Sequence, residues 1–163
     1  MHDPQPRHFQ ALKRLLLYIQ GTITFGIPLL QSLLNLSTYV DADWASDPHD
    51  RKSTIGFCTF LGSNLISWSI KKQTTVAKSS TEAEYRALAS ATPDIVWLRR
   101  LLQDFDVKQI QPTKVYCDNT FAIALARNPV FHARTKHIEI DYHFISQHLK
   151  EKEIELLHIS SVD

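Results

Sequence analysis

The chain has 163 residues, a formal net charge of +1, and 21% charged residues. This length suits one domain with a short flanking segment, and the small net charge excludes attraction of nucleic acid by a strong overall field. The longest apolar stretches are too short to cross a bilayer, and Cys58 and Cys117 match no zinc spacing, so we expect no membrane contact and reducing, cytoplasmic surroundings.

The N-terminal part of the chain predicts an amphipathic helix. Apolar residues recur at steps of three and four from position 7 to position 20. Residues 22–34 contain a glycine and a proline and indicate a connector. We therefore divide the chain into the helix with its connector, residues 1–34, and a second unit, residues 35–163.

Three strands are predicted next. Residues 53–61 are apolar on both faces, which is typical of a buried central strand, and residues 66–71 alternate between apolar and polar side chains. A Gly-Ser-Asn turn joins these two strands into a hairpin. The first strand is predicted over residues 36–43. Trp68 in the third strand and Trp44 after the first are predicted to be core residues rather than platforms for stacking bases.

The remaining pattern alternates helices with strands. Helical periodicity covers 81–91 and resumes over 93–105, and the later elements are a strand at 113–118, helices at 120–127 and 138–150, and a strand at 153–159. Helical crossovers imply parallel pairing, whereas the hairpin is antiparallel. The expected fold class is therefore α/β, with a five-stranded mixed sheet flanked by helices.

Three carboxylates occupy positions where burial of an unpaired charge is costly. Asp41 lies within the first strand, and Asp118 ends the fourth, where ligand sites of parallel strands gather. Glu84 shares a helix face with apolar residues and is expected to point toward the sheet. Glu82 shares its side with Arg86 and is expected to point outward, where it forms a capping box with Ser79.

Two interpretations of Asp118 remain open at this stage. Asp118 is a possible N-cap of the next helix, although Asn119 can supply that cap instead. Alternatively, Asp41, Glu84 and Asp118 converge on a pair of divalent cations, for which oxygen ligands favour Mg²⁺ or Mn²⁺ over zinc. Such a pair catalyses phosphodiester hydrolysis.

At these residues the chain resembles a known family. The runs YVDADWASDPHDRKSTIGFCTFLGSNLISWSIKKQ, SSTEAEYRAL, WLRRLL, VYCDN and NPVFHARTKHIEIDYHFI are similar, in order, to the ribonuclease H domain of copia-type LTR retrotransposons. HFQALKRLLLYIQGT resembles the segment that joins reverse transcriptase to this domain. The likeness covers nearly the whole chain.

The resemblance implies a ribonuclease H-like fold and an endonuclease that cuts the RNA strand of RNA/DNA hybrids with two Mg²⁺ ions, with Mn²⁺ as a substitute. It implies that Asp41 bridges both metals while Glu84 and Asp118 complete their shells. It also implies the reverse transcriptase domain of the same polyprotein as a partner, and a retrotransposon particle as the location. The family has a fourth acid in a C-terminal helix, and this chain ends where that helix is expected, with Asp163 too early and Asp141 on the wrong helix to replace it.

Several polar residues are candidates for contact with nucleic acid. Basic side chains supply most contacts to phosphates, and the competing interpretation is ordinary solvated charge. The histidines near position 137 suggest a metal cluster at first sight, but their spacing matches no standard zinc site, and the structural interpretation is favoured. The predicted contact set is Lys71, Lys72, Lys78, Ser79, Asn119, Arg134, Lys136 and His137.

Two functions of different classes follow. The first is an active ribonuclease H. The second is a catalytically inactive, truncated ribonuclease H-like module that binds nucleic acid or serves a structural role, which the absent fourth acid favours. An integrase or junction-resolvase scaffold shares the fold but not these motifs and ranks last.

Overall fold

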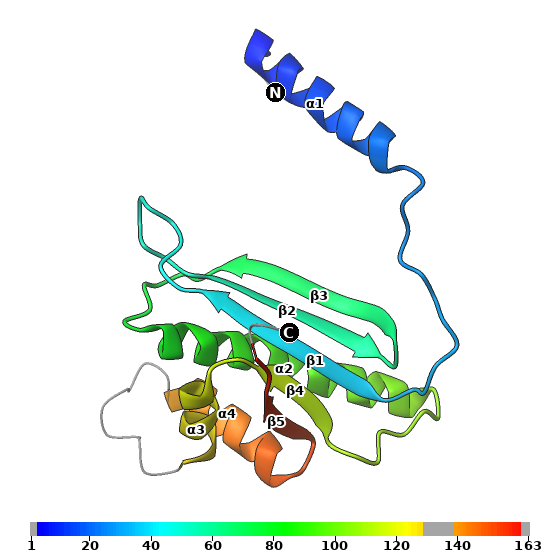
Figure 1. The fold of residues 1–163 in the computed structure, drawn as a ribbon, viewed down its shortest axis with the longest axis vertical. Helices are drawn as coiled ribbons and strands as arrows, with labels where there is room; N and C mark the ends of the chain where they lie inside the picture. The colour runs from blue at the N-terminus through cyan, green and yellow to red at the C-terminus, as the bar shows by residue number, and fades with distance from the viewer. Residues whose placement is uncertain (1–2, 129–138, 161–163) are drawn as a thin grey trace.

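A computed structural model describes residues 3–128 and 139–160 of the chain (Figure 1). The order of elements expected from the sequence is confirmed. The elements are α1 (Pro6–Thr22), β1 (Leu36–Asp43), β2 (Thr54–Leu61), β3 (Asn64–Lys72), α2 (Ser80–Asp104), β4 (Thr113–Cys117), α3 (Thr120–Arg127), α4 (Glu139–Lys150) and β5 (Ile154–His158).

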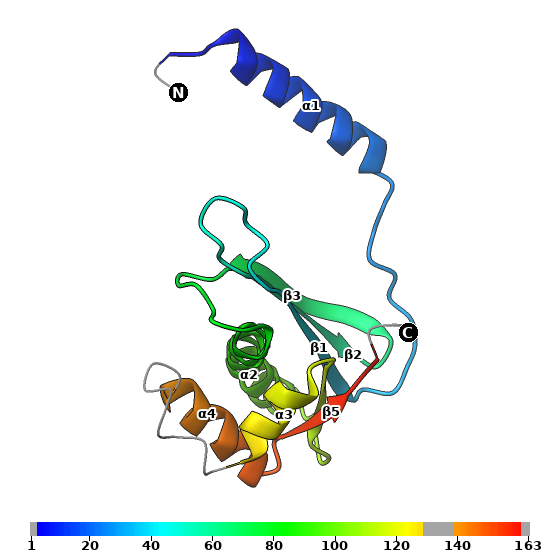
Figure 2. The same cartoon turned by 60° about the vertical axis from the view of Figure 1, so that its left-hand side comes forward.

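The five strands form one mixed sheet in the order β3-β2-β1-β4-β5. The pairs β1–β2 and β2–β3 are antiparallel, and the pairs β1–β4 and β4–β5 are parallel. Figure 2 shows α2, α3 and α4 on the same side of this sheet. The expected α/β class is thus confirmed, and no described helix is both long and apolar enough to span a membrane.

The core lies between the sheet and α2. Alternate residues of β1, such as Val40, are buried toward the helix, where they meet Leu88 and Ile95. Because side chains of a strand alternate between faces, the intervening residue Tyr39 emerges on the opposite side and is 40% exposed. This alternation decides which β1 side chains reach the core and which reach solvent.

The helix α2 runs through Pro93 without a break, whereas the sequence suggests two consecutive helical stretches. Proline removes one backbone N–H from the helical ladder, but its ring is exposed here and does not disturb the core. Burial of Leu88, Ala91 and Ile95 on both sides of the proline stabilises the continuous helix against the sheet.

The face of the sheet away from the helices is open, which corrects two predictions. Trp68 is 56% exposed and Trp44 is 48% exposed, so neither is a core residue. Strand β2, predicted to be buried on both faces, has only Ile55 and Thr59 buried. The alternation identified the two faces correctly, but only the face that carries α2, α3 and α4 is covered by a described helix.

The helix α1 stands apart from the sheet in Figures 1 and 2. None of its side chains is buried, and apolar residues such as Phe9 and Leu16 are more than half exposed. The connector that follows is fastened at its C-terminal end, where the N–H of Gly62 donates to the carbonyl of Asn35 at 2.8 Å. Residues 1–34 and 35–163 therefore remain our proposed division of the chain.

Candidate metal centre

The candidate site lies where β1 and β4 separate. The last paired residues of these parallel strands are Tyr39 and Tyr116, whose rings stack at a centroid distance of 4.8 Å. Beyond this pair β1 continues through Asp41, whereas β4 ends and the chain turns at Asp118. The carboxylate of Glu84 enters from α2 and lies close to that of Asp118, and the charge of Asp41 also acts on it.

Glu84 is the buried member of this group, with 4% of its surface exposed. Its Oε1 accepts a hydrogen bond from the backbone N–H of Ala42 at 2.8 Å, and its Oε2 lies 3.6 Å from the Sγ of Cys117. The pKa of Glu84 is raised to about 7, mainly by burial and also by the charges of Asp118 and Asp41, although the hydrogen bond from Ala42 lowers it.

Asp118 lies beside Glu84 and does not cap α3. One ligand atom each of Glu84, Cys117 and Asp118 lie within 4.8 Å of one another. The N-cap is Asn119, whose side chain accepts from the N–H of Ala122 at 3.0 Å. The structure therefore favours Asn119 as the helix cap and leaves the carboxylate of Asp118 available to the site.

Cys117 is a part of the site that sequence reasoning missed. Its side chain is fully buried. Its contact with Glu84 was not expected, because only the tertiary structure joins β4 to α2. Burial raises the pKa of Cys117 to about 12, so the group is a thiol at neutral pH. Its position next to Asp118 in the sequence was the one available signal.

Glu82 does not look outward as predicted. It is 8% exposed, its Oε1 lies 2.6 Å from Nη2 of Arg86, and its Oε2 accepts from the N–H of Lys78 at 3.0 Å. Half of the expected capping box is present: Ser79 Oγ accepts from the N–H of Glu82, whereas the Glu82 carboxylate accepts from Lys78 and not from Ser79. Arg86 also donates to the carbonyl of Thr75, and this hydrogen bond links the ion pair to the 73–78 loop.

The structure distinguishes among the predicted contacts to nucleic acid. Lys71 and Lys78 are exposed, whereas Lys72 forms ion pairs with Asp47 and Asp50. These pairs lower the pKa of Asp47 and raise that of Lys72 through hydrogen bonding. Lys72 therefore fastens the loop between β1 and β2 to β3, and its charge is partly neutralised.

The other predicted site residues do not join the three acids. Arg134, Lys136 and His137 lie outside the described residues, as does Asp163. Asp141 lines a separate pocket with Arg86 and Lys71, and burial raises its pKa. It therefore supplies no fourth carboxylate to the cluster of described residues.

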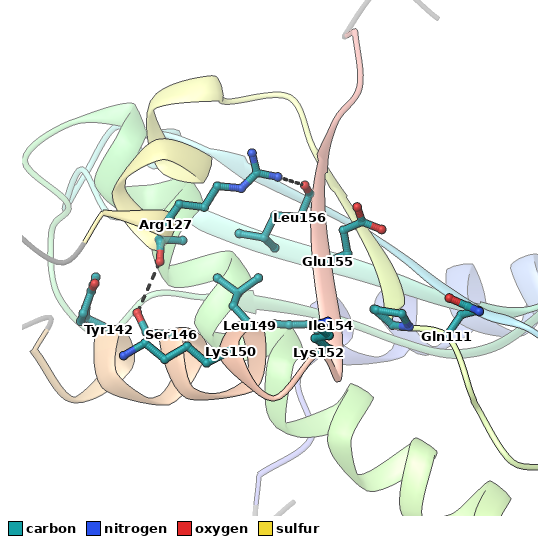
Figure 3. A pocket seen from close by; sticks show the side chains of 12 residues that line it. Gln111, Arg127, Tyr142, Ser146, Leu149, Lys150, Lys152, Ile154, Glu155 and Leu156 are labelled. Atoms are coloured by element: carbon teal, nitrogen blue, oxygen red, sulfur yellow. Dashed lines mark hydrogen bonds between the residues drawn. The ribbon is translucent and has the colours of Figure 1, made fainter.

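A pocket of about 660 Å³ lies between α4 and the outer edge of β5 (Figure 3). Arg127 Nη2 donates to the carbonyl of Leu156 at 2.6 Å, and the hydroxyl of Ser146 donates to the carbonyl of Ala126 at 3.3 Å. These bonds join α3 to the edge strand and α4 to α3. None of the three acids lines this pocket.

Comparison with known sequences finds Pol polyproteins of transposons as relatives. The chain is 46% identical over its whole length to the retrovirus-related Pol polyprotein from transposon RE1 of Arabidopsis thaliana and 38% identical over 99% of its length to that from transposon TNT 1-94 of Nicotiana tabacum. This chain is a relative of the transposon Pol polyproteins. It spans 11% and 12% of these two relatives, so it matches one segment of each. No family model matches it.

Solved structures show that this chain has the ribonuclease H fold. A compost-derived LC11-RNase H1 superimposes with a TM-score of 0.55 at 19% identity, over 80% of this chain and 87% of that one. The same protein in complex with RNA/DNA hybrid gives a TM-score of 0.53 at 16% identity, covering 78% and 87%. Prototype foamy virus protease-reverse transcriptase gives 0.52 at 16% identity, over 81% of this chain and 18% of that one.

The acidic residues of this site suit a hard divalent cation. Asp41 and Asp118 offer carboxylates that are not buried, and Glu84 offers an oriented one whose raised pKa reflects repulsion between uncompensated acids as well as burial. A bound cation would relieve that repulsion. Carboxylate oxygens match Mg²⁺ and Mn²⁺, and the buried Cys117 is held as a neutral thiol rather than as a thiolate ligand.

Proposed function

We propose that the chain is a ribonuclease H that hydrolyses the RNA strand of RNA/DNA hybrids by two-metal-ion catalysis during retrotransposon reverse transcription. The observation that carries the proposal is the buried carboxylate of Glu84 where β1 and β4 separate: it lies beside Asp118, and the charges of Asp118 and Asp41 both act on it. The sequence likeness to Pol polyproteins and the ribonuclease H fold support it.

Each acid has a distinct part in this proposal. Asp41, exposed on the open side of the strand, and Asp118, at the end of β4, present carboxylates toward solvent and substrate. Glu84 is oriented by the N–H of Ala42 and completes the proposed ligand set from α2. Two Mg²⁺ ions held by these residues would activate a water and stabilise the leaving oxygen of the phosphodiester.

Substrate binding would use exposed cations around the site. Lys71 and Lys78 are exposed on either side of the 73–77 loop, and Arg134, Lys136 and His137 belong to the same proposal from the sequence. Ser79 and Asn119 cap α2 and α3, and their neighbouring helix N-termini favour anionic groups such as phosphates. We assign Lys72 a smaller part because its charge is paired.

The partner and the location follow from the Pol relatives. The exposed apolar face of α1 is proposed to pack on a reverse transcriptase domain of the same polyprotein. The proposed location is the cytoplasm, within a retrotransposon particle. Both proposals, the partner and the location, rest on the Pol relatives, and this chain spans 11% of the length of the RE1 polyprotein.

The test is cleavage of a labelled RNA/DNA hybrid with Mg²⁺, with Mn²⁺ and with a chelator. We expect the wild type to cut only with a divalent cation and to leave the DNA strand intact, and we expect Asp118→Asn to lose at least a hundredfold in rate. A version extended by further Pol sequence is measured in parallel, because the proposed ligand set of Asp41, Glu84 and Asp118 holds three acids.

The same assay decides between the two functions. Cutting only by the extended version would show that the chain as given is a catalytically inactive, truncated module of a working nuclease. Hybrid binding without cutting in either version would overturn the proposed nuclease and favour the binding or structural module. The observation that favours this alternative is that the proposed ligand set holds three acids.

A further inference from the structure

The two oxygens of Glu84 face donors from two different strands. Oε1 accepts the N–H of Ala42 in β1, and Oε2 lies 3.6 Å from the thiol sulfur of Cys117 in β4. Ala42 lies three residues past Tyr39, the last residue of β1 that pairs with β4. The separation of the strands therefore frees that N–H for a side chain from α2.

The thiol of Cys117 has two acceptors within reach. The carbonyl of Asn119 lies at 3.9 Å, and the carboxylate of Glu84 lies at 3.6 Å. One S–H donates to one acceptor at a time, and a charged acceptor gives the stronger hydrogen bond. Cys117 is fully buried, so water does not compete for the thiol. The nearer and charged oxygen of Glu84 is therefore the favoured partner whenever that carboxylate is ionised.

We propose that Cys117 is a positioning residue that, together with the N–H of Ala42, fixes the rotation of the Glu84 carboxylate and keeps it beside Asp118. The terminal torsion of a glutamate is broad, so one donor alone leaves the carboxylate free to turn. Two donors from separate strands restrict it. The expected effect on metal binding rests on the proposed function. The orientation of the Glu84 carboxylate by its two donors does not.

Three variants test the proposal. Cys117→Ala removes the donor, Cys117→Ser keeps a hydroxyl donor of similar size, and Cys58→Ala removes the second cysteine, which is half-buried in β2 opposite Tyr39. Mg²⁺ binding to the hybrid-free protein is measured by calorimetry, and the melting temperature is measured in chelator to separate binding from folding.

We expect Cys117→Ala to weaken Mg²⁺ binding about tenfold, as is usual for loss of a group that orients a metal ligand. Cys117→Ser should stay within about twofold of the wild type and Cys58→Ala should match it. Wild-type binding by Cys117→Ala would overturn the proposal. Equal losses in Cys117→Ala and Cys117→Ser would overturn it as well, since the donor would then not be the cause.

A metal-independent measurement keeps the two proposals distinguishable. If the wild type neither binds Mg²⁺ nor cuts the hybrid, the proposed function fails. The side-chain carboxyl ¹³C signal of Glu84 is then compared between metal-free wild type and Cys117→Ala. A changed signal that Cys117→Ser restores would support positioning by the thiol, and an unchanged signal would overturn it.

Discussion

The side-chain amide of Asn64 pairs with both backbone polar groups of Leu30. Its Oδ1 accepts from the N–H of Leu30 at 2.6 Å, and its Nδ2 donates to the carbonyl of Leu30 at 2.8 Å. A side chain at the start of β3 thus holds the connector 34 residues earlier. Gln109 adds a second attachment, because its Nε2 donates to the carbonyl of Leu34 at 2.8 Å.

Gly62 allows this attachment. Its φ of +61° lies in the left-handed region, and a Cβ there would lie 2.1 Å from the carbonyl oxygen of Leu33. The connector therefore packs closely against the backbone at position 62, where any side chain larger than that of glycine would clash with it. The connector that follows α1 is thus held to the sheet at this turn.

The first prediction concerns Asn64→Ala. Loss of the paired hydrogen bonds should lower stability by about 1 kcal/mol and speed hydrogen exchange at the amide of Leu30 at least tenfold. Amide exchange followed by mass spectrometry or NMR measures the effect. Ser63→Ala is the matched control, because Ser63 holds the connector through its backbone N–H. Equal exchange in the two variants would show that Asn64 does not hold the connector.

The second prediction concerns Asp41→Asn. This change removes a charge from the proposed ligand set while keeping the shape of the side chain, so hybrid cleavage should fall at least a hundredfold with the melting temperature nearly unchanged. Asp43→Asn removes the same charge from the same face of β1 two residues later, and its rate should stay within about threefold of the wild type. Comparable losses in both variants would indicate a general field effect instead of metal ligation.

The third prediction concerns pH and Glu84. Its pKa in the metal-free fold, about 7, exceeds the ordinary 4.5, so the folded protein binds the extra proton more tightly than the unfolded chain. The contribution of the neutral acid to stability is complete below about pH 4.5 and is lost as pH rises through 7, with an upper limit of about 3 kcal/mol.

Glu84→Gln should remove this dependence. In chelator, we expect the variant to melt close to the wild type at pH 5 and above it at pH 8, because the amide is never ionised. Thermal melting at several pH values measures the difference, with Glu155→Gln on the exposed side of β5 as control. A Glu84→Gln difference that stays constant with pH would contradict the prediction.

The fourth prediction separates two adjacent lysines. Lys71→Ala should reduce the salt dependence of hybrid binding by about one phosphate contact, because Lys71 is exposed. Lys72→Ala should change that slope less and instead speed hydrogen exchange in the 47–52 loop, since its ion pairs to Asp47 and Asp50 hold the loop. Binding in Ca²⁺, followed by fluorescence anisotropy against salt, measures the slopes. The reverse ranking would assign the phosphate contact to Lys72.

The fifth prediction concerns α1. Phe9, Leu12 and Leu16 are exposed on this helix, so the isolated chain should self-associate at micromolar concentrations. The double change Leu12→Asp with Leu16→Asp should give a monomer, whereas Lys13→Asp should not. Sedimentation velocity measures the outcome, and a monodisperse wild-type monomer would contradict it.

The sequence by itself determined the elements and their order. Local periodicity placed β1 at residues 36–43, where the structure has it, and it distinguished Glu84 from Glu82 by the apolar residues on its helix face. The order of hairpin, crossover and strand implied the mixed sheet, because short turns permit antiparallel pairing and helical connections permit parallel pairing. Local pattern carries this information because it depends only on neighbours in the chain.

The tertiary structure alone decided which faces are covered and which distant groups meet. Alternation in β3 shows two faces but not which one a helix covers, so the exposure of Trp68 followed only from the position of α2. Glu82 is buried beside Arg86, which also donates to the carbonyl of Thr75 in the loop before α2. The contact of Cys117 with Glu84 joins residues 33 apart in the chain, and no local pattern encodes that distance.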